Sequence, residues 1–244
     1  MTTSPSLSKF GKSYQEAAKL IDRDKLYEPY EAIEILKKTA RAKFDETVEL
    51  HIRTGADPRH ADQLIRSVVM LPHGTGKTNK VIVFAQGEAI AWAREAGADY
   101  IGDDETIERI EKEGWADFDV AIATPEMMGR IGRLGRTLGR RGLMPNPRAG
   151  TVVQPGDIPR TVRESKGGRL EFRMDRAANL HIPIGKISFA EEALVANLAA
   201  TLDAVTRARS EGIKGQLYRS INLSTTMGPS ITLDIPKALA IEDN

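Results

Sequence analysis

The stretch LPHGTGKT, residues 71–78, ends in the glycine, lysine and threonine that close a phosphate-binding loop. Such a loop reads G-x-x-x-x-G-K-S/T, because a glycine-rich turn must aim successive backbone N–H groups at the phosphates. The first glycine of that spacing would stand at position 71, which is Leu71, and Pro72 and His73 interrupt a direct entry from a strand. A nucleotide-dependent enzyme is therefore the weaker interpretation, and a polar turn that links two parts of the chain is the stronger one.

The rest of the sequence gives little support to catalysis. It contains neither the G-x-S-x-G turn of a nucleophilic serine nor a complete dinucleotide-binding fingerprint. The absence of cysteine excludes disulfides, thiolate zinc sites and cysteine nucleophiles. The histidines are not spaced as a helical metal-binding pair. We expect no catalytic residue, no cofactor and no metal.

Polar side chains on a short strand suggest RNA binding instead. In KFDETVELHIRTG, residues 43–55, apolar and polar residues alternate from position 47 to position 53, which is the period of a strand with one buried face. On the other face, Thr47 and Glu49 can hydrogen-bond riboses or base edges, and Lys43 can meet a phosphate. From the pattern alone, Phe44 is interpreted as a core residue more readily than as a stacking platform.

A later segment, FRMDRAANLH, carries charged groups beside an expected turn. Arg173 and Arg176 are candidates for phosphate contacts, and Asp175 and His181 for contacts to 2′-hydroxyls or bases. Taken alone, an ordinary hairpin with a charged outer face explains this segment better.

The segment STTMGPS, residues 224–230, combines a turn with small and flexible side chains. Gly228 and Pro229 favour a turn, Thr226 offers a hydroxyl, and Met227 offers a flexible apolar cap. Because glycine has no side chain, an RNA backbone can approach such a turn closely. Taken alone, the segment is only a turn.

The charges are segregated along the chain although the net charge is only +1. Residues 88–119 hold 11 acidic and 3 basic residues, whereas residues 123–150 hold six arginines and a single glutamate. A near-neutral sum counts against a nucleic-acid binder, but a polyanion responds to the local field. The arginines of GRIGRLGRTLGRRG either follow phosphates along one helical side or form a solvated basic face, and the pattern favours neither.

The predicted secondary structure changes in type along the chain. Residues 13–40 have helical spacing, and residues 43–55 and 64–71 are typical of strands. Strands and helices then alternate from residue 80 to residue 125, which predicts a βαβ unit with a mostly parallel sheet. Strand patterns return at 168–174, 178–185 and 218–235, with a long helix over 189–207. The first and second of these returning strands are expected to be neighbours.

This order predicts an α/β domain inserted into a split α+β domain, with chain crossings near residues 71 and 160. Leu71, Pro72, Gly74 and Gly76 would form a flexible hinge at the first crossing. With 41% hydrophobic and 28% charged residues, no membrane-spanning apolar run and no secretory signal, the protein is expected to be cytoplasmic.

Several stretches together resemble the bacterial large-subunit ribosomal protein L-one family along nearly the whole chain. The stretches are KFDETVELHIRTGADPRHADQ, LPHGTGK, AGADYIG, FDVAIATPEMM, GRLGRTLGRRGLMPNPRAGTV, IGKISF and STTMGPS. The resemblance implies an RNA-binding α+β domain of residues 1–70 plus 161–244 and an inserted Rossmann-like α/β domain of residues 71–160. The expected partners are large-subunit rRNA at the mobile stalk, exit-site tRNA whose release is assisted, and the leader of the protein's own mRNA, whose translation is repressed. The protein is expected to be a monomer within the ribosome and to bind no membrane.

The resemblance also implies which residues contact RNA. They are Lys43, Phe44, Thr47, Glu49, Arg173, Asp175, Arg176, His181, Ser220, Thr226, Met227 and Gly228. It turns Phe44 from a core residue into one at the RNA-facing edge. The chain departs from the family pattern at Arg140, where a proline is usual, and at Ala177 and Ala178, where Thr-Gly is common. Two alternatives remain, a nucleotide-dependent enzyme using LPHGTGKT and a polyanion-binding scaffold without selectivity for RNA.

Overall fold

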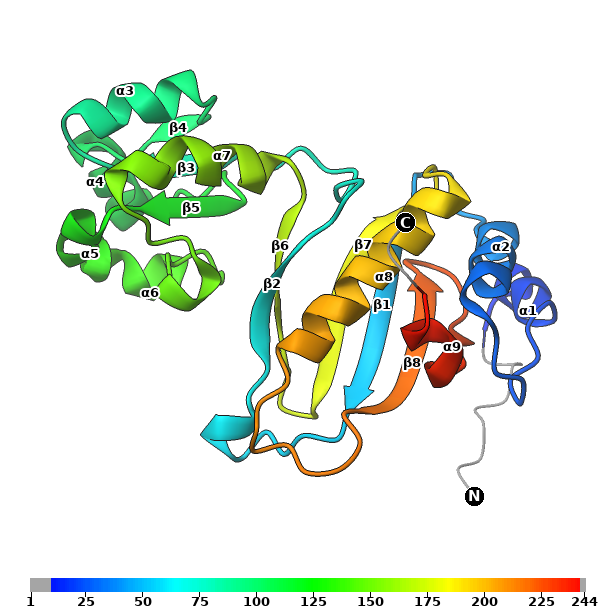
Figure 1. Ribbon diagram of the computed structural model, residues 1–244. Coiled ribbons are helices and arrows are strands. Elements are labelled where there is room, and N and C mark those ends of the chain that lie inside the picture. Colours follow the sequence, from blue (N-terminus) through cyan, green and yellow to red (C-terminus); the bar gives the residue numbers. More distant parts are fainter. Residues whose placement is uncertain (1–9, 242–244) are drawn as a thin grey trace. The chain divides into compact units, whose positions relative to one another are not determined.

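The computed structural model describes residues 10–241, which divide into two compact units (Figure 1). The first unit comprises the chain through Gly76 and from Phe172 onward, and the second comprises Lys77–Glu171. The predicted fold class, an α/β unit inserted into a split α+β unit, is confirmed. The second division lies beyond residue 160, the limit expected from the sequence, because helix α7 (Ile158–Lys166) packs on strands and a helix of the inserted unit.

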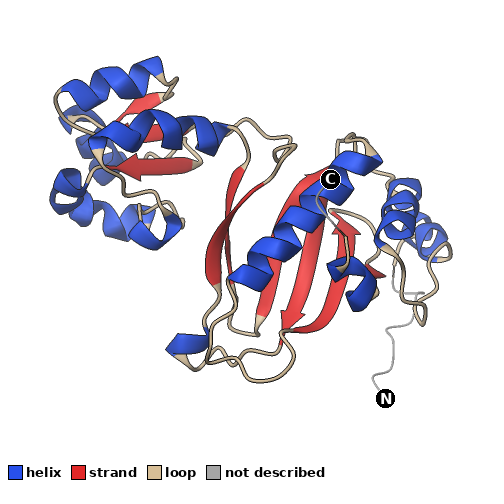
Figure 2. Ribbon diagram, viewed as in Figure 1, coloured by secondary structure: helices blue, strands red, loops and turns tan. Residues whose placement is uncertain are grey.

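The first unit is built on an antiparallel sheet of four strands in the order β7-β1-β8-β9. Figure 2 draws the strands in red and the helices in blue. Its strands are β1 (Thr47–Thr54), β7 (Asn179–Lys186), β8 (Tyr218–Thr225) and β9 (Ile231–Thr232). Thr47 lies opposite Lys186 of β7, and Val48 lies opposite Thr225 of β8. One end of the sheet therefore gathers the beginning of β1 and the ends of β7 and β8.

In the described part of the chain, helices cover the face of this sheet to which the apolar residues of β1 point and leave the other face open. Val48, Leu50 and Ile52 are fully buried, whereas the residues between them are partly or fully exposed, as the alternation predicts. Helix α8 (Glu191–Arg207) packs on β7, β2 and α2, and Figure 1 shows it lying along the sheet. The other face of β1 remains available for polar contacts.

The remaining helices of the first unit are short and begin or end at recognisable signals. They are α1 (Lys12–Ala18), α2 (Pro29–Thr39), the 3₁₀ turn η2 (Ala61–Gln63) and α9 (Ile235–Leu239). Pro29 occupies the first turn of α2, where its missing N–H costs no hydrogen bond. The Asp234 carboxylate caps α9 by accepting the N–H of Lys237.

The strand that precedes β7 is not its neighbour, so the expected pairing of these two strands is wrong. Strand β6 (Arg169–Arg173) pairs with β2 (Arg66–Met70) in a separate two-stranded sheet, whereas β7 pairs with β1. The backbone shows the transfer, because the N–H of Met174 already donates to the carbonyl of Ile65. Residues 174–178 are thus a turn between two sheets.

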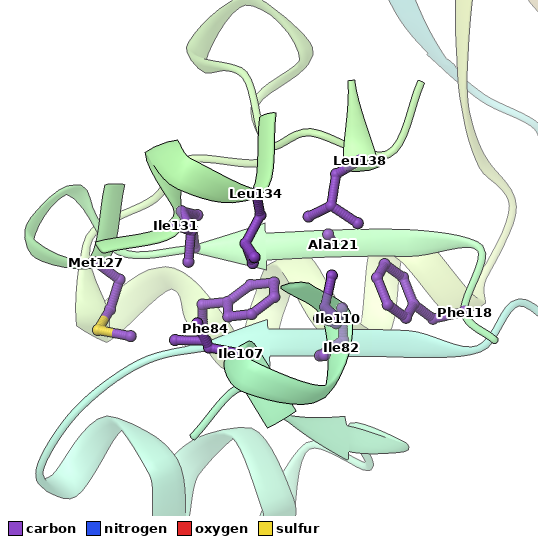
Figure 3. Close-up of a cluster of buried hydrophobic side chains, with 11 residues drawn as sticks. Ile82, Phe84, Ile107, Ile110, Phe118, Ala121, Met127, Ile131, Leu134 and Leu138 are labelled. Atoms are coloured by element: carbon purple, nitrogen blue, oxygen red, sulfur yellow. The ribbon is translucent and has the colours of Figure 1, made fainter. Parts of the chain in front are cut away.

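The second unit contains a parallel sheet of three strands in the order β4-β3-β5. The strands are β3 (Val81–Phe84), β4 (Tyr100–Ile101) and β5 (Val120–Ala123). All four side chains of β3 are buried, and they alternate between two apolar clusters, one on each face of the sheet. Figure 3 shows the cluster that contains Phe84, with Ile107 and Ile110 of α4 packed on it. Both faces are closed, as a continuous apolar run predicts.

Helices and turns of the second unit surround that sheet. They are α3 (Glu88–Glu95), α4 (Asp104–Glu113), α5 (Pro125–Ile131), η3 (Gly132–Leu134), α6 (Gly135–Leu138), η4 (Pro147–Ala149), η5 (Pro155–Asp157) and α7. Helix α4 has a signal at each end: the Asp103 carboxylate accepts the N–H of Thr106, and Gly114 ends the helix in the left-handed region at φ 67°.

Candidate nucleic-acid interface

The turn after β8 is fastened directly to the beginning of β1. The N–H of Thr47 donates to the Thr226 hydroxyl at 3.0 Å, and the N–H of Thr226 donates to the carbonyl of Thr47 at 3.1 Å. The two segments are 179 residues apart in sequence. The polar strand and the terminal turn identified in the sequence therefore form one surface.

A buried carboxylate fixes this surface from below. Glu46 is 1% exposed, and its side chain accepts the N–H groups of Arg41, Ala42 and Met227 at 3.1, 2.9 and 2.9 Å. Burial alone would raise the pKa of this carboxyl group, but the neighbouring Thr225 hydroxyl and these N–H groups outweigh burial and lower the pKa. Glu46 is thus an ionised clamp that joins the segment before β1 to the turn after β8.

Gly228 is required by the packing of the same turn. A Cβ atom at this position would lie 2.3 Å from the hydroxyl oxygen of Thr225, which is buried below the turn. Met227, by contrast, is 52% exposed and Phe44 is 54% exposed. Phe44 is therefore not a core residue, which corrects the interpretation from the pattern alone. The exposed edge lies at the end of the sheet.

We call this end of the sheet the strand-end corner. It consists of Lys43, Phe44, Thr47, Thr226, Met227 and Gly228. Two further cations border it: Lys186 donates to the Thr47 hydroxyl at 2.8 Å, and Arg41 donates to the carbonyl of Met227 at 3.1 Å. Exposed apolar groups beside fixed donors suit the stacking and phosphate contacts of folded RNA.

The centre of the open sheet face holds a pair of histidines. His51 and His181 lie with their Nδ1 atoms 2.8 Å apart, and the Nε2 atom of His51 lies 2.9 Å from the Ser224 hydroxyl. Burial lowers the pKa of His51, and the nearby His181 lowers it further, while Glu49 opposes the change. The sequence-predicted residues Glu49 and His181 therefore belong to one polar network across three strands.

The remaining predicted residues lie at the opposite end of the sheet from the corner. Ser220 lies opposite Arg53, six residues along β1 from Thr47, which corresponds to about 20 Å at the usual rise of a strand. Arg173, the last residue of β6, and Arg176, on the turn between β6 and β7, are both exposed. The predicted set thus forms a strip along the sheet, not one compact cluster.

The turn at Asp175 forms without the glycine that the family pattern commonly has there. The Asp175 carboxylate accepts the N–H groups of Ala177 and Asn179 at 2.7 and 2.8 Å. The N–H of Asn179 makes the largest contribution to the pKa of Asp175, and it lowers this pKa. Burial, which would raise the pKa, has a smaller effect, and the N–H of Ala177 lowers it further. Ala178 adopts φ 65°, a left-handed conformation that costs an alanine roughly 1–2 kcal/mol. Asp175 is therefore first of all a turn-forming residue.

The segment predicted as a hinge is held by a buried amide. Asn197 of α8 is 0% exposed; it accepts the N–H of His73 at 3.0 Å and donates to the carbonyls of Gly74 and Ile184 at 2.9 and 2.7 Å. Leu71 is buried and Pro72 is exposed beside it. These contacts belong to the first unit, so residues 71–74 are anchored before the chain leaves it.

The loop LPHGTGKT is not arranged as an open cradle for phosphate. A Cβ atom on Gly76 would lie 2.6 Å from Lys186 and 3.0 Å from Phe189, which already pack against the loop. The Lys77 ammonium lies 2.5 Å from the carboxylate of Asp119. Packed atoms and an ion pair occupy the space that a nucleotide would need.

The basic segment of the second unit is partly neutralised by the acidic helix α4. Arg130 pairs with Asp104, and Arg133 lies 3.4 Å from Glu111. The arginine series is therefore not one uninterrupted basic face. Within residues 10–241, no group of three or more histidine, aspartate or glutamate side chains is arranged to hold a metal ion. In the same range, no helix has the length and apolarity needed to cross a membrane.

Sequence reasoning missed four side chains that shape the interface, namely Arg41, Glu46, Lys186 and Asn197. A signal existed for two of them. Glu46 precedes Thr47 and continues the inward series of β1, so the alternation places a carboxylate on the buried face. Asn197 lies among Leu194, Leu198 and Leu202 on the buried side of α8. Polar residues in such positions need internal partners.

Comparison with known proteins points to a single family. Residues 36–229 match the model of the ribosomal protein L1p/L10e family. The large ribosomal subunit protein uL1 of Chloroflexus aggregans is 57% identical over 94% of this chain and 97% of its own length. The uL1 proteins of Chloroflexus aurantiacus and Thermomicrobium roseum are each 55% identical, over 93% and 94% of this chain and 96% and 95% of their own lengths.

Proposed function

Because the chain belongs to the ribosomal protein L1p/L10e family and is a protein of the large ribosomal subunit, we propose that it binds large-subunit rRNA at the mobile stalk near the exit site. The chain is not an enzyme, and its place is the ribosome in the cytoplasm. We also propose two consequences of RNA binding: the protein assists the release of deacylated tRNA, and it represses translation of its own mRNA.

The observation that carries the proposal is the mutual hydrogen bonding of Thr47 and Thr226 at the strand-end corner. It fixes the backbone of the segments that carry the exposed side chains Phe44 and Met227, so little conformational entropy is lost on binding. Arg41 and Lys186 border this corner, and Lys43 within it supplies a third positive charge. A rigid surface of this kind recognises the shape and 2′-hydroxyls of folded RNA.

The arginines at the far end of the strip would have a different role. Arg173 and Arg176 are exposed, so they would contribute a salt-dependent share of affinity through phosphate contacts. Asp175 would act by holding their turn, and His181 and Ser220 would contact the RNA between the two ends. In this scheme the corner provides most of the selectivity for RNA shape.

Filter binding of a stalk fragment of large-subunit rRNA across a salt series tests this division. Thr226→Val removes the hydroxyl that accepts the Thr47 N–H, and it should weaken binding about tenfold or more. Arg173→Gln should weaken binding less. It should also make the dependence of log affinity on log salt concentration shallower, by the amount that corresponds to about one phosphate contact. Equal and small losses in the two variants would refute the leading role of the corner.

A polyanion-binding scaffold without selectivity makes a contrasting prediction. Unlabelled stalk RNA should displace the labelled fragment at far lower concentration than an unrelated duplex does. Equal competition by the two would support the scaffold.

Repression of the protein's own mRNA would use the same strip. A leader RNA of this transcript should compete with the stalk fragment, and Thr226→Val should weaken both complexes together. Assistance in tRNA release would be measured on ribosomes that lack the protein, from which deacylated tRNA should leave the exit site more slowly. Unchanged release would remove that part of the proposal.

We also propose a hinge between the two domains. We propose the segment of residues 71–76 as the hinge between the two domains: Asn197 anchors residues 73 and 74 to the first domain, and the chain pivots beyond them at Gly76 (φ 73°). Asn197→Leu should release this anchor, and a pair of fluorescent labels, one in each domain, should then report a broader distribution of distances.

A further inference from the structure

A small pocket lies beside the strand-end corner, between α1 and the segment that follows Gly228. Its volume is about 340 Å³, at the lower end of ligand sites, and Phe10, Tyr14, Asp22, Arg23, Pro229 and Ser230 are among the residues that line it. All of these residues belong to the first unit. None of them is among the residues predicted to contact RNA.

One wall of the pocket is aromatic and leads directly to the corner. The rings of Phe10 and Tyr14 are stacked, with centroids 4.5 Å apart and an angle of 28° between their planes. The Arg41 guanidinium lies 5.2 Å from the centroid of Tyr14, and the same group donates to the carbonyl of Met227. Phe10, Tyr14, Arg41 and Met227 therefore form a continuous series of flat or polarizable groups.

The polar groups of the pocket complement that wall. The Asp22 carboxylate accepts the N–H of Asp24 through one oxygen, and among residues 10–241 its other oxygen has no hydrogen-bond donor, so it can accept a further hydrogen bond. Arg23 and Ser230 are exposed beside it and supply a cation and a hydroxyl. An aromatic face, an acceptor and a cation within one small pocket match the three parts of a nucleotide: a flat base, its N–H edge and its phosphate.

We propose that this pocket takes one unpaired nucleobase of the RNA bound at the strand-end corner, stacked on the aromatic wall with its N–H edge toward Asp22. This inference rests on the proposed function. The continuity through Arg41 favours RNA as the occupant, because its guanidinium contacts both Met227 of the corner and Tyr14 of the pocket, so a strand that crosses the corner passes a cation on its way to the pocket. It adds a base-reading site to a surface otherwise suited to shape and 2′-hydroxyls.

A purely architectural role for the aromatic pair is the competing explanation. Phe10 and Tyr14 would then only fasten the start of α1, where Gln15 also donates to the carbonyl of Phe10. The two explanations differ in what happens when RNA is bound. Only the proposed site brings a base into contact with the rings.

The test uses the full-length protein and the stalk RNA fragment, with 2-aminopurine placed in turn at each unpaired position. One position should be strongly quenched on binding to the wild type, and an abasic nucleotide there should weaken binding about tenfold. Tyr14→Leu keeps an apolar side chain but removes the stacking face, so it should abolish the quenching and weaken binding to intact RNA about tenfold. It should weaken binding to the abasic RNA no further.

Tyr30→Leu is the matched control, because Tyr30 is a tyrosine of α2 that is 61% exposed and does not line the pocket. It should leave both affinity and quenching unchanged. Thermal unfolding checks the fold of each variant, and Phe10→Leu replaces Tyr14→Leu if the latter unfolds.

The outcomes separate this inference from the proposed function. If the wild type binds and Thr226→Val weakens binding, but no position is quenched and Tyr14→Leu binds within twofold of the wild type, the pocket proposal is wrong and the RNA-binding surface stands. If the wild type does not bind the stalk fragment, both are wrong. Quenching that persists in Tyr14→Leu would also overturn the pocket.

Discussion

The four-stranded sheet of the first unit and the three-stranded sheet of the second differ in how helices cover them. In β1, the inward residues are fully buried and the outward residues Thr47, Glu49 and His51 remain partly exposed. In β3, every side chain is buried between two apolar clusters. The antiparallel sheet therefore offers a polar face to a ligand, whereas the parallel sheet offers none and can expose chemistry only through its helices and loops.

The polar groups beneath the strand-end corner differ from those of the basic segment of the second unit. The first unit places Glu46 and Asn197 in its interior, and each fixes a turn by hydrogen bonds to backbone groups. In the basic segment of the second unit, Arg130 and Arg133 are instead drawn into surface ion pairs with Asp104 and Glu111. Interior polar groups define the shape of a surface precisely, while surface pairs contribute little to stability.

The largest effect is expected from the core of the second unit. Ile110→Ala removes a fully buried side chain from the cluster on Phe84, and it should destabilise that unit by about 2–5 kcal/mol. If only the first unit presents the RNA surface, affinity for the stalk fragment should be unchanged below the unfolding temperature. Chemical denaturation and filter binding on one sample measure both. A tenfold loss of affinity in the folded variant would show that the second unit also contributes to RNA binding.

A smaller loss of stability, but a loss of affinity as well, is expected from Glu46→Gln. The glutamine has one acceptor oxygen where the carboxylate has two, so the N–H of Met227 or those of Arg41 and Ala42 would face an NH₂ group. The cost should be about 1–3 kcal/mol. RNA affinity should fall too, because the turn at Met227 loosens. Glu192→Gln, an exposed glutamate in the first turn of α8, is the control and should change neither.

The dependence on pH sharpens this test. Since the pKa of Glu46 is lower in the folded protein than its ordinary value of 4.5, its stabilising contribution is present above pH 4.5 and is lost as the pH falls through the folded-state pKa. The wild type should therefore lose more stability than Glu46→Gln does when the pH is lowered below 4.5. If the free energy of unfolding fell equally with pH in the wild type and in Glu46→Gln, the role of the ionised carboxylate would be contradicted.

The unusual backbone of Ala178 gives the next effect, this time stabilising. Ala178→Gly relieves the left-handed strain at φ 65°, and because glycine also loses more chain entropy on folding, the net gain should be about 1 kcal/mol or less. Thermal unfolding measures it, with Ala177→Gly as the control, since Ala177 is not among the residues with positive φ. A loss of stability in Ala178→Gly would show that the turn tolerates alanine without strain.

Periodicity in the sequence was sufficient for most of the fold. The alternation in residues 47–53 gave β1 with the correct buried face, and the strand–helix alternation of residues 80–125 gave the parallel sheet. The pairing of β6 with β2 was missed, because β6 and β7 are joined by a short turn and such strands usually pair with each other. The Asp175 turn carries the chain to another sheet, and no local pattern encodes that transfer.

The candidate surface was predictable as a set of residues but not as a geometry. Thr47 and Thr226 were named from separate segments, and only the register of β1 against β8 brings them together. The clamp at Glu46 was overlooked because a glutamate beside a strand is usually solvated, although its position in the alternation was an inward one. Long-range hydrogen bonds of this kind depend on tertiary structure that a single sequence does not display.

The smallest expected effect concerns the histidine pair on the open face of the first sheet. The pKa of His51 is below its ordinary value of 6.5 because burial and the neighbouring His181 disfavour its charged form, although Glu49 favours it. At this site the unfolded chain therefore binds more protons than the folded one below pH 6.5, so the contribution of His51 to stability is constant above that pH and declines as the pH falls toward the folded-state pKa. In His51→Asn this decline should be shallower between pH 6.5 and 5, whereas His73→Asn, at an exposed position, should follow the wild type. Urea denaturation at several pH values measures the slopes. The second sheet has no open face on which such a pair could lie, so the histidine pair is one of the features that distinguish the two sheets. If the loss of stability at low pH were unchanged in His51→Asn, the pair would have no effect on stability and this distinction would be lost.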